Sequence, residues 1–301
     1  MTARASIGMP VFNRASTVGR AIESVLAQTF TDFELLVSDN ASSDGTEPIC
    51  RRHAAGDPRI RYTRHPATIS GLDNFRFVLE QARAPYFMWL PADDYVRARW
   101  LEQAVPILDA QPDVVCVAPR AEFLEADGTF RPATGSFPLL GDVRENLCRY
   151  LVDPTDNSRF YGLYRREAVR RVLPEEAYYG FDWVVAAGTL LYGKHTELPE
   201  VLLVREANDP LKYTRMIDTI AETWLDRVLP LGRFTLALLG RLRVAPHPRL
   251  LWALLRINVI HHVMYCQYRY PRYGRAAYRL GAGLERLGAN ALRALSRRRA
   301  A

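Results

Sequence analysis

The chain has 301 residues, of which 49% are hydrophobic and 24% charged, and its net charge is +7. This composition is ordinary for a globular protein and argues against an intrinsically disordered chain. The four cysteines are scattered without CxxC or metal-ligand spacing, so we expect reduced thiols in a cytoplasmic protein. The first residues run directly into a strand-like segment and the uncharged runs are short. We therefore expect neither a signal peptide nor a membrane span.

Charge is distributed unevenly along the chain. Residues 1–214 contain 24 Lys and Arg against 29 Asp and Glu, a net of −5. Residues 215–301 contain 16 against 4, a net of +12, and the two parts sum to +7. A break of this size predicts two functional regions, a domain over residues 1–214 and a basic helical extension over residues 215–301.

The first half of the sequence alternates strand and helix signals. Apolar runs predict strands at residues 5–12, 33–38, 59–63 and 86–90, and helical spacing predicts helices at 16–28, 72–83 and 97–110. Such alternation predicts an α/β fold in which helices cover a mostly parallel sheet. Right-handed crossovers then place the carboxyl ends of the first, second and fourth strands on one edge. That edge would bring together Asn13, Asp39 and the pair Asp93 and Asp94.

The most informative segment is an apolar run at residues 86–91, which is followed after Ala92 by two adjacent carboxylates, Asp93 and Asp94. Buried charge is costly, so these acids must lie at the exposed end of a strand or hold a cation. In open α/β sheets ligands bind at that end, and two acids there suit a divalent ion that shares a substrate's phosphates. The alternative is that they cap the next helix. Asp39, at the tip of the second strand, could likewise merely start a turn.

Later segments are less regular. They predict strands at residues 114–118 and 160–164, a polar loop at 153–158, a helix at 181–192 and a strand pair at 194–197 and 201–205. Residues 250–255 and 257–265 predict a buried helix, in which His261 and His262 are core or interface residues rather than ligands. Neither GxGxxG nor GxxxxGK[ST] occurs, so a Rossmann dinucleotide site and a P-loop are not supported.

Several segments follow one another in a characteristic order and spacing: residues 8–13 (GMPVFN), 21–30 (AIESVLAQTF), 38–46 (SDNASSDGT), the strand ending in Asp93-Asp94, 160–166 (FYGLYRR), and the stretch from 182–184 (DWV) through 192–194 (YGK) to 199–201 (PEV). Together they resemble glycosyltransferase family 2. The likeness covers about residues 4–206. It implies the GT-A fold, a Rossmann-like, mostly parallel sheet flanked by helices, here followed by a C-terminal α-helical extension.

The resemblance also implies roles for single residues. The backbone around Pro10, Phe12 and Asn13 and the carboxylate of Asp39 would hold the nucleotide base. The Asp73-Asn74 pair would line the nucleotide pocket near the ribose. Asp93 matches the metal-binding acid of the family, with Asp94 beside it. Asp182 matches the general base, although it could also serve as the N-cap of the helix that it precedes.

Two departures from the family pattern concern the phosphate end of the site. Many relatives carry Asp two residues before the metal-binding acid, where this chain has Pro91, so fewer carboxylates are available to a metal. Many relatives also carry His just past the last strand of the domain, whereas residues 205–210 (REANDP) contain none. Lys212 or Arg215 could neutralise the leaving pyrophosphate instead.

The resemblance therefore predicts an inverting transferase that uses Mn²⁺ or Mg²⁺ and a nucleotide-diphosphate sugar, with UDP as the expected nucleotide. The acceptor would be a glycan or lipid-linked hydroxyl in surface polysaccharide synthesis, reached from the cytoplasmic face of a membrane. The alternative is a nucleotide-sugar-binding subunit that has lost turnover. A nucleotidyltransferase is a further option, against which the family-like context of Asp182 argues.

The basic tail allows two interpretations. On a helical wheel, residues 275–297 separate a narrow Leu and Ala stripe from an Arg face, although three glycines lower helix propensity. The stripe could pack on the first domain or in a homodimer, leaving the Arg face solvated. Alternatively, the tail could adhere to an anionic membrane surface. Nucleic acid is not expected as a partner, because no recognised module accompanies the charge.

Overall fold

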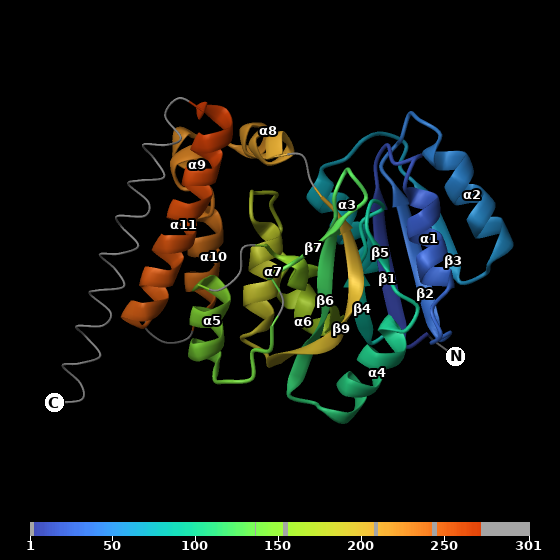
Figure 1. The fold of residues 1–301 in the computed structure, drawn as a ribbon, viewed down its shortest axis with the longest axis horizontal. Helices are drawn as coiled ribbons and strands as arrows, with labels where there is room; N and C mark the ends of the chain where they lie inside the picture. The colour runs from blue at the N-terminus through green and yellow to red at the C-terminus, as the bar shows by residue number, and fades with distance from the viewer. Residues whose placement is uncertain (1–2, 136, 153–155, 208–209, 243–245, 272–301) are drawn as a thin grey trace. The chain divides into compact units, whose positions relative to one another are not determined.

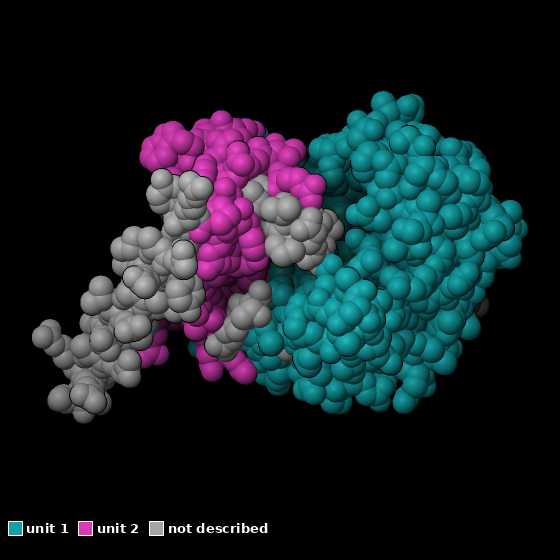
Figure 2. All heavy atoms as spheres, turned by 45° about the horizontal axis from the view of Figure 1, so that its top comes forward, with its two compact units in different colours: residues 1–143, 154–177, 185–207 teal, residues 144–153, 178–184, 208–301 magenta. Residues whose placement is uncertain are grey.

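A computed structural model of the chain describes residues 3–135, 137–152, 156–207, 210–242 and 246–271. The chain divides into two compact units (Figure 2). Unit 1 comprises residues 1–143, 154–177 and 185–207, and unit 2 comprises residues 144–153, 178–184 and 208–301. Because the units interleave along the chain, the assignment of residues 1–214 and 215–301 to separate functions stays a prediction.

Unit 1 is built on one sheet with the strand order β3-β2-β1-β4-β8-β6-β9-β5, and β7 pairs with β6 (Figure 1). The strands are β1 (Ala5–Val11), β2 (Phe33–Asp39), β3 (Ile60–Arg64), β4 (Tyr86–Trp89), β5 (Tyr95–Val96), β6 (Val114–Leu124), β7 (Phe130–Pro132), β8 (Leu163–Arg165) and β9 (Lys194–Glu206). β1 pairs in parallel with β2 and β4, and β2 pairs in parallel with β3. The predicted α/β class and the alignment of the first, second and fourth strands are therefore confirmed.

Helices alternate with these strands. They are α1 (Val18–Leu26), α2 (Thr46–Gly56), α3 (Gly71–Gln81), α4 (Trp100–Ala110), the 3-10 helix η1 (Ser158–Tyr161), α6 (Arg166–Val172) and the later part of α7 (Phe181–Thr189). In α1 the buried residues include Val18, Ile22 and Val25, which confirms the helical spacing seen in the sequence. α3 packs closely on β1 at Gly8, where a Cβ would lie only 2.6 Å from Cγ2 of Val78.

The apolar run that ends at the acidic pair forms the centre of the sheet. All four residues of β4 are buried, and the strand lies between β1 and β8. The Trp89 ring stacks on Phe160 with centroids 4.7 Å apart, and its indole N–H donates to the carbonyl oxygen of Phe75 at 3.0 Å. These contacts bury the indole with its polar N–H satisfied, as a tryptophan in a core requires.

Several predicted elements differ from the structure: the helix predicted at residues 181–192 ends at Thr189, and the strand predicted at 114–118 continues to Leu124. The strand predicted at residues 160–164 is split into η1 and the shorter β8. The pair of strands predicted at 194–197 and 201–205 is one strand, β9, parallel to β6. Residues 198–200 face the single residue Pro119 of β6, and Pro199 has no N–H for the ladder, so the chain bulges and continues in the same direction. The helix predicted from residue 97 begins at Trp100 instead.

Unit 2 is helical. It contains most of α5 (Val143–Val152), the first turn of α7, and α8 (Pro210–Ile220), α9 (Trp224–Val228), α10 (Gly232–Arg241) and α11 (Pro248–Arg269). α11 confirms the buried helix expected there, and the buried amide of Asn258 accepts from the Leu231 N–H at 3.1 Å and donates to Thr235 Oγ1 at 2.9 Å. None of the described helices combines the length and the apolar character needed to cross a membrane.

The cysteines are free thiols, as the sequence predicted. Cys50 and Cys116 are buried, whereas Cys148 and Cys266 are partly exposed. Burial raises the pKa of both buried thiols to about 12, so they are protonated and inert at neutral pH.

Candidate active site

Two loops at the carboxyl edge of the sheet are tied to each other. The backbone N–H of Asn13 donates to Ser42 Oγ at 2.9 Å, and Asn13 Oδ1 accepts from the Ser43 N–H at 2.9 Å. The next residue, Arg14, donates its N–H to Thr46 Oγ1 at 2.8 Å. Asn13 has φ of 51°, in the left-handed region that Asn tolerates better than most residues. Asn13 thus holds the loop after β1 against the loop after β2, while its neighbour Phe12 is 46% exposed.

Asp39 ends β2 and is fully buried. Its Oδ1 accepts from the Ser42 N–H at 2.9 Å, so the turn role that the sequence left open is present. Its Oδ2 accepts from the Tyr62 hydroxyl at 2.8 Å, and Arg64 Nε lies 3.9 Å away. Burial, and then this hydrogen bond to Asp39, raise the pKa of Tyr62, which stays a neutral donor. Each carboxylate oxygen can accept a second hydrogen bond, but the side chain has no exposed surface, so its predicted contact with a ring N–H stays a prediction.

The Asp73-Asn74 pair separates into an exposed and a buried residue. Asn74 is buried in α3, where its Oδ1 accepts from Ser38 Oγ at 2.6 Å and its Nδ2 donates to the Ser38 carbonyl at 3.2 Å. It fastens α3 to β2. Asp73 has a side chain that is 50% exposed and accepts from Ser70 Oγ and Arg76 Nη1, each at 2.6 Å. Of the two, Asp73 is the one that solvent and a ligand can reach.

Asp93 follows β4 and keeps part of its side chain, 18%, exposed. Its Oδ2 lies 3.5 Å from Nε of Arg14, and its carbonyl oxygen accepts from Arg20 Nη2 at 3.1 Å. α4 begins at Trp100 with Arg99 as its N-cap, so neither acid caps that helix and the capping alternative is wrong. The loops after β1 and β4 therefore meet at this carboxylate, as the strand topology predicted.

Asp94 makes contacts different from those of its neighbour. Its side chain is only 6% exposed; Oδ1 accepts from the Glu206 N–H at 3.0 Å, and Oδ2 lies 3.5 Å from Arg205 Nε. Arg205 also donates to Ser158 Oγ at 3.1 Å and lies over the Tyr161 ring at 4.8 Å. In the sequence, the only sign of this partner is an arginine near the end of an apolar strand. Asp94 fixes the end of β9, and its predicted place in the metal site stays a prediction.

The acidic side chains suit a metal ion that also binds a substrate's phosphates, rather than one enclosed by protein ligands alone. In the ranges that the structure describes, no three His, Cys, Asp or Glu side chains gather closely enough to hold a metal ion. Mg²⁺ and similar ions are commonly held by one or two carboxylates together with substrate phosphates. The partly exposed carboxylate of Asp93 at a strand tip fits that donor set.

Comparison with known proteins identifies the family. A model of the protein family described as glycosyl transferase family 2 matches residues 6–173, more than half of the chain. The chain belongs to glycosyl transferase family 2. This match covers β1 to β4, the acidic pair and η1, and it confirms the resemblance found in the sequence.

Individual relatives match this family 2 chain over shorter stretches than the family model does. It is 34% identical over 90 residues to the GalNAc(5)-diNAcBac-PP-undecaprenol beta-1,3-glucosyltransferase of Campylobacter jejuni, a match that covers 30% of this chain and 29% of that protein. The matched part spans 21%, 14% and 38% of the length of three other curated relatives, so a minor share of each is represented.

Two solved structures confirm the GT-A-like architecture. S. aureus TarS 1-349 in complex with UDP-GlcNAc aligns with a TM-score of 0.58 at 14% identity, covering 95% of this chain and 92% of that chain. The mannosyltransferase PcManGT from Pyrobaculum calidifontis, in complex with GDP-Man and Mn²⁺, aligns with a TM-score of 0.58 at 15% identity, covering 96% and 80%. At such identities the likeness shows the fold alone.

The predicted base of this family 2 glycosyltransferase lies in unit 2. Gly180, with φ of 86°, turns the chain into α7, and Asp182 stands in the first turn of that helix, so it is not the N-cap considered from the sequence. The Trp183 ring beside it packs between Tyr150 and His261, with centroids 5.4 and 5.6 Å away. An acidic side chain in a first turn is also stabilised by the helix dipole.

Other predicted residues lie outside what can be described. Lys212 belongs to α8, but its side chain is outside the described residues. The tail of residues 275–297 lies outside them as well. Its membrane and packing roles therefore stay predictions.

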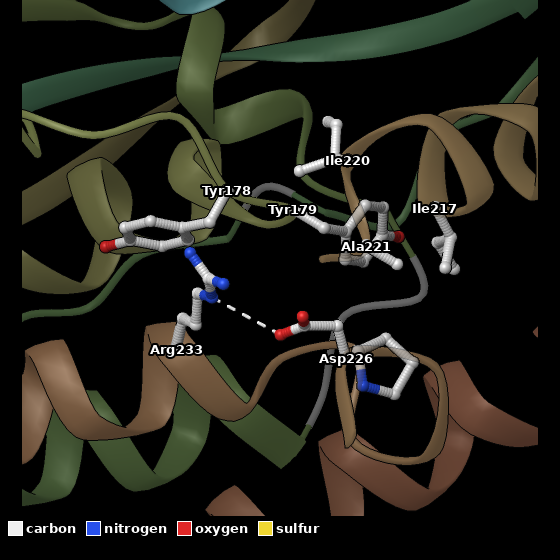
Figure 3. A pocket seen from close by; sticks show the side chains of 8 residues that line it. Tyr178, Tyr179, Ile217, Ile220, Ala221, Asp226 and Arg233 are labelled. Atoms are coloured by element: carbon white, nitrogen blue, oxygen red, sulfur yellow. Dashed lines mark hydrogen bonds and ion pairs between the residues drawn. The ribbon is translucent and has the colours of Figure 1, made fainter. Parts of the chain in front are cut away.

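A small cavity of about 10 Å³ lies in unit 2 (Figure 3). Its wall combines aromatic and apolar residues with the ion pair of Arg233 and Asp226, whose closest atoms are 3.3 Å apart. The buried hydroxyl of Tyr178, which also lines it, has no hydrogen-bond partner among the described residues. The cavity has room for about one water molecule, too little for a sugar nucleotide.

Proposed function

We propose that this chain transfers a sugar from a nucleoside-diphosphate sugar to an acceptor hydroxyl with inversion at the anomeric carbon. The observation that carries the proposal is the partly exposed carboxylate of Asp93, which follows the central strand of a family 2 fold. Ligands of open α/β sheets bind at that edge. Asp39 at the end of β2, Arg14 in the loop after β1 and Asp73 in the first turn of α3 lie at the same edge, where a nucleotide would lie.

In this proposal both buried and exposed groups contribute to binding the donor. The backbone around Pro10, Phe12 and Asn13 and the remaining acceptor capacity of Asp39 would hold the base. Asp73 would accept from the ribose hydroxyls, and buried Asn74 would keep the start of α3 in place through Ser38. The loops tied by Asn13 would then present one preorganised surface, which reduces the entropy that binding costs.

The chemistry follows from where charge develops. As the acceptor oxygen forms its bond to the anomeric carbon, the bond from that carbon to the phosphate oxygen breaks, and the nucleoside diphosphate leaves with the electron pair. A divalent ion held by Asp93 would stabilise the charge on the diphosphate. Asp182 would accept the proton of the acceptor hydroxyl. A single displacement with one base on the acceptor face gives inversion.

The choice of donor and acceptor has support from the relatives. UDP is the proposed nucleotide because TarS binds UDP-GlcNAc, although PcManGT binds GDP-Man on the same fold. A lipid-linked acceptor in surface glycan synthesis is proposed from the undecaprenol-linked substrate in the name of the Campylobacter jejuni relative. Association of two chains through the helices of unit 2 remains a proposal from the sequence.

A panel of UDP- and GDP-sugars tests the proposal. We expect one donor to be hydrolysed slowly by the full chain with Mn²⁺ or Mg²⁺, and EDTA to stop the reaction. With an acceptor, NMR of the product should show the anomeric configuration opposite to that of the donor. Tight donor binding without any turnover would instead support the non-catalytic subunit, and retention of configuration would exclude the single displacement.

A further inference from the structure

Arg14 lies beside the proposed metal acid, Asp93, although no role was predicted for it from the sequence. Its backbone N–H is fixed by Thr46 Oγ1 at 2.8 Å, and its Nη1 donates to the carbonyl oxygen of Asn13 at 3.0 Å. The Nε atom of the same guanidinium lies 3.5 Å from Oδ2 of Asp93. The side chain is 37% exposed, so one edge stays open to a ligand.

Neighbouring arginines at this edge have other partners. Arg20 lies over the Tyr95 ring at 4.7 Å and donates to the main-chain oxygen of Asp93. Arg64 pairs with Glu47 at 2.7 Å. Arg14, in contrast, is joined at its side chain to the very carboxylate that a divalent ion would need. A dication placed at Asp93 would repel Arg14 unless an anion entered with it.

We propose that Arg14 is a ligand of the donor's diphosphate, and that it exchanges Asp93 for phosphate oxygens when metal and donor bind. This inference rests on the proposed function. A guanidinium recognises phosphate through paired N–H donors, which a lysine cannot reproduce. The exchange leaves each charge compensated: the metal ion faces Asp93, and Arg14 faces the diphosphate. Arg14 also supplies, from unit 1, the cation that many relatives provide with a histidine just past the last strand of the domain.

Calorimetry on the full chain tests the exchange with Arg14→Gln, Arg14→Lys and the control Arg83→Gln, an exposed arginine at the opposite end of β4. The probes are Mn²⁺ alone, UDP or GDP with Mn²⁺ (whichever binds the wild type more tightly), and the matching nucleoside. Arg14→Gln should lower diphosphate affinity by about 10- to 100-fold, the range of a charged hydrogen bond, without changing nucleoside affinity. Arg14→Lys should lose less, and Arg83→Gln nothing.

Binding of Mn²⁺ alone tests the ion pair between Arg14 and Asp93, whereas diphosphate affinity separates a ligand from a counter-ion. Freeing Asp93 in Arg14→Gln should raise Mn²⁺ affinity by about two- to fivefold, as expected for losing one partly exposed ion pair. If diphosphate affinity is unchanged or higher in that variant, Arg14 is only a counter-ion and the proposal is wrong. If the wild type itself binds no nucleoside diphosphate, the proposed function fails, and the role of Arg14 with it. A circular dichroism melt shows that each variant is folded.

A separate observation concerns α9, which turns apolar side chains outward. Trp224, Leu225 and Val228 of this short helix are 69%, 48% and 42% exposed, and Leu229, directly after it, is 41% exposed. Its polar residues face other protein groups: Asp226 accepts from the Thr223 N–H and pairs with Arg233, and Arg227 pairs with Asp218. The capping box of Thr223 and Asp226 holds this arrangement.

We infer that the outward face of α9 docks on an anionic lipid bilayer. Clustered exposed apolar residues mark interaction sites, and tryptophan favours the headgroup level. Charge decides the occupant. By sequence, residues 208–301 carry 17 Lys and Arg against 5 Asp and Glu, a net of +12. A second copy would bring like charges together, whereas anionic headgroups complement them.

Co-sedimentation of the full chain with phosphatidylcholine vesicles, with and without phosphatidylglycerol, tests this inference. Binding should require the anionic lipid, and the double variant Trp224→Ser/Leu225→Ser should bind about tenfold less. The matched control is Leu140→Ser, which removes a leucine of unit 1 that is 52% exposed. Undiminished binding of the double variant, with loss only on deletion of residues 272–301, would assign the contact to the tail. A dimer that dissociates in the double variant would assign it to a second copy. Either result would overturn the inference.

Discussion

The two units treat their buried polar groups differently. At the edge of unit 1, opposite charges are buried together: the side chains of Arg205 and Asp94 are 13% and 6% exposed. In the centre of unit 2 the buried groups are neutral, with Asn258 bonded to Thr235 and His261 to Tyr179. Buried charges cost more than neutral hydrogen-bonded groups of similar size. Unit 1 bears a cost that packing alone does not require, and such costs are typical of functional sites.

The largest expected effect comes from Asp93 in unit 1. Asp93→Ala should abolish measurable transfer and weaken metal-dependent binding of the nucleoside diphosphate. Without this carboxylate the metal ion that balances the charge on the leaving group would be lost. Asp94→Asn should bind metal and diphosphate nearly as the wild type does, since Asp94 contacts the end of β9. The measurements are turnover and calorimetry with Mn²⁺. Equal losses in the two variants would mean that both carboxylates hold the ion.

Asp182 tests whether unit 2 contributes to catalysis. Asp182→Asn keeps the size of the side chain but cannot take the acceptor proton, so turnover should fall by about 10²- to 10⁴-fold. Donor affinity should stay the same by calorimetry, because the donor contacts proposed above lie in unit 1. Glu222→Gln, which neutralises an exposed acid of unit 2, is the control and should leave turnover intact. If donor binding collapses while turnover persists, Asp182 is structural.

Arg205 tests the cost of buried charge directly. Arg205→Met would leave the carboxylate of Asp94 buried without its cation, and we expect a loss of about 3 kcal/mol in the free energy of unfolding. Arg171→Met on α6 removes an arginine that is 56% exposed and lies 3.2 Å from Glu167, itself 64% exposed, and it should cost less than about 1 kcal/mol. Urea denaturation measures both. Similar losses would show that the Arg205 pair is no different from a surface pair.

Adding Asp94→Asn to Arg205→Met should recover part of that stability, because the unpaired charge is removed. A double variant as unstable as the sum of the two single variants would show that the residues do not interact.

The sequence predicted the frame of unit 1 because its signals are local. β1, β2 and β4 are apolar runs bounded by turn residues, and their parallel pairing follows from the helices between them. The position of Asp93 at their common edge followed as well. What could not be predicted depends on residues far apart in the chain. Asp94 turns toward Arg205, 111 positions later, only because β5 pairs with β9. The bulge at Pro199 likewise depends on its partner strand, β6.

The last expected effect is the pH dependence of unit 2. Burial lowers the pKa of His261 to about 3, whereas an unfolded chain titrates it near its ordinary value of 6.5. Below pH 6.5 His261 binds a proton in the unfolded state but not in the folded state. Its contribution to folding stability is therefore complete above pH 6.5 and is lost progressively as the pH falls toward 3. The slope for one such group is about 1.4 kcal/mol per pH unit.

Comparing wild type with His261→Gln isolates this contribution. The variant can still accept from Tyr179, so its stability at pH 7.5 should fall only modestly, while the slope of unfolding free energy between pH 6 and 4 should decrease by about 1.4 kcal/mol per unit. Burial also lowers the pKa of His195 in unit 1, and that residue is unchanged in both proteins, so it cancels in the difference. An unaltered slope would mean that His261 is protonated in the folded state. The contrast between a charged edge in unit 1 and a neutral centre in unit 2 would then be lost.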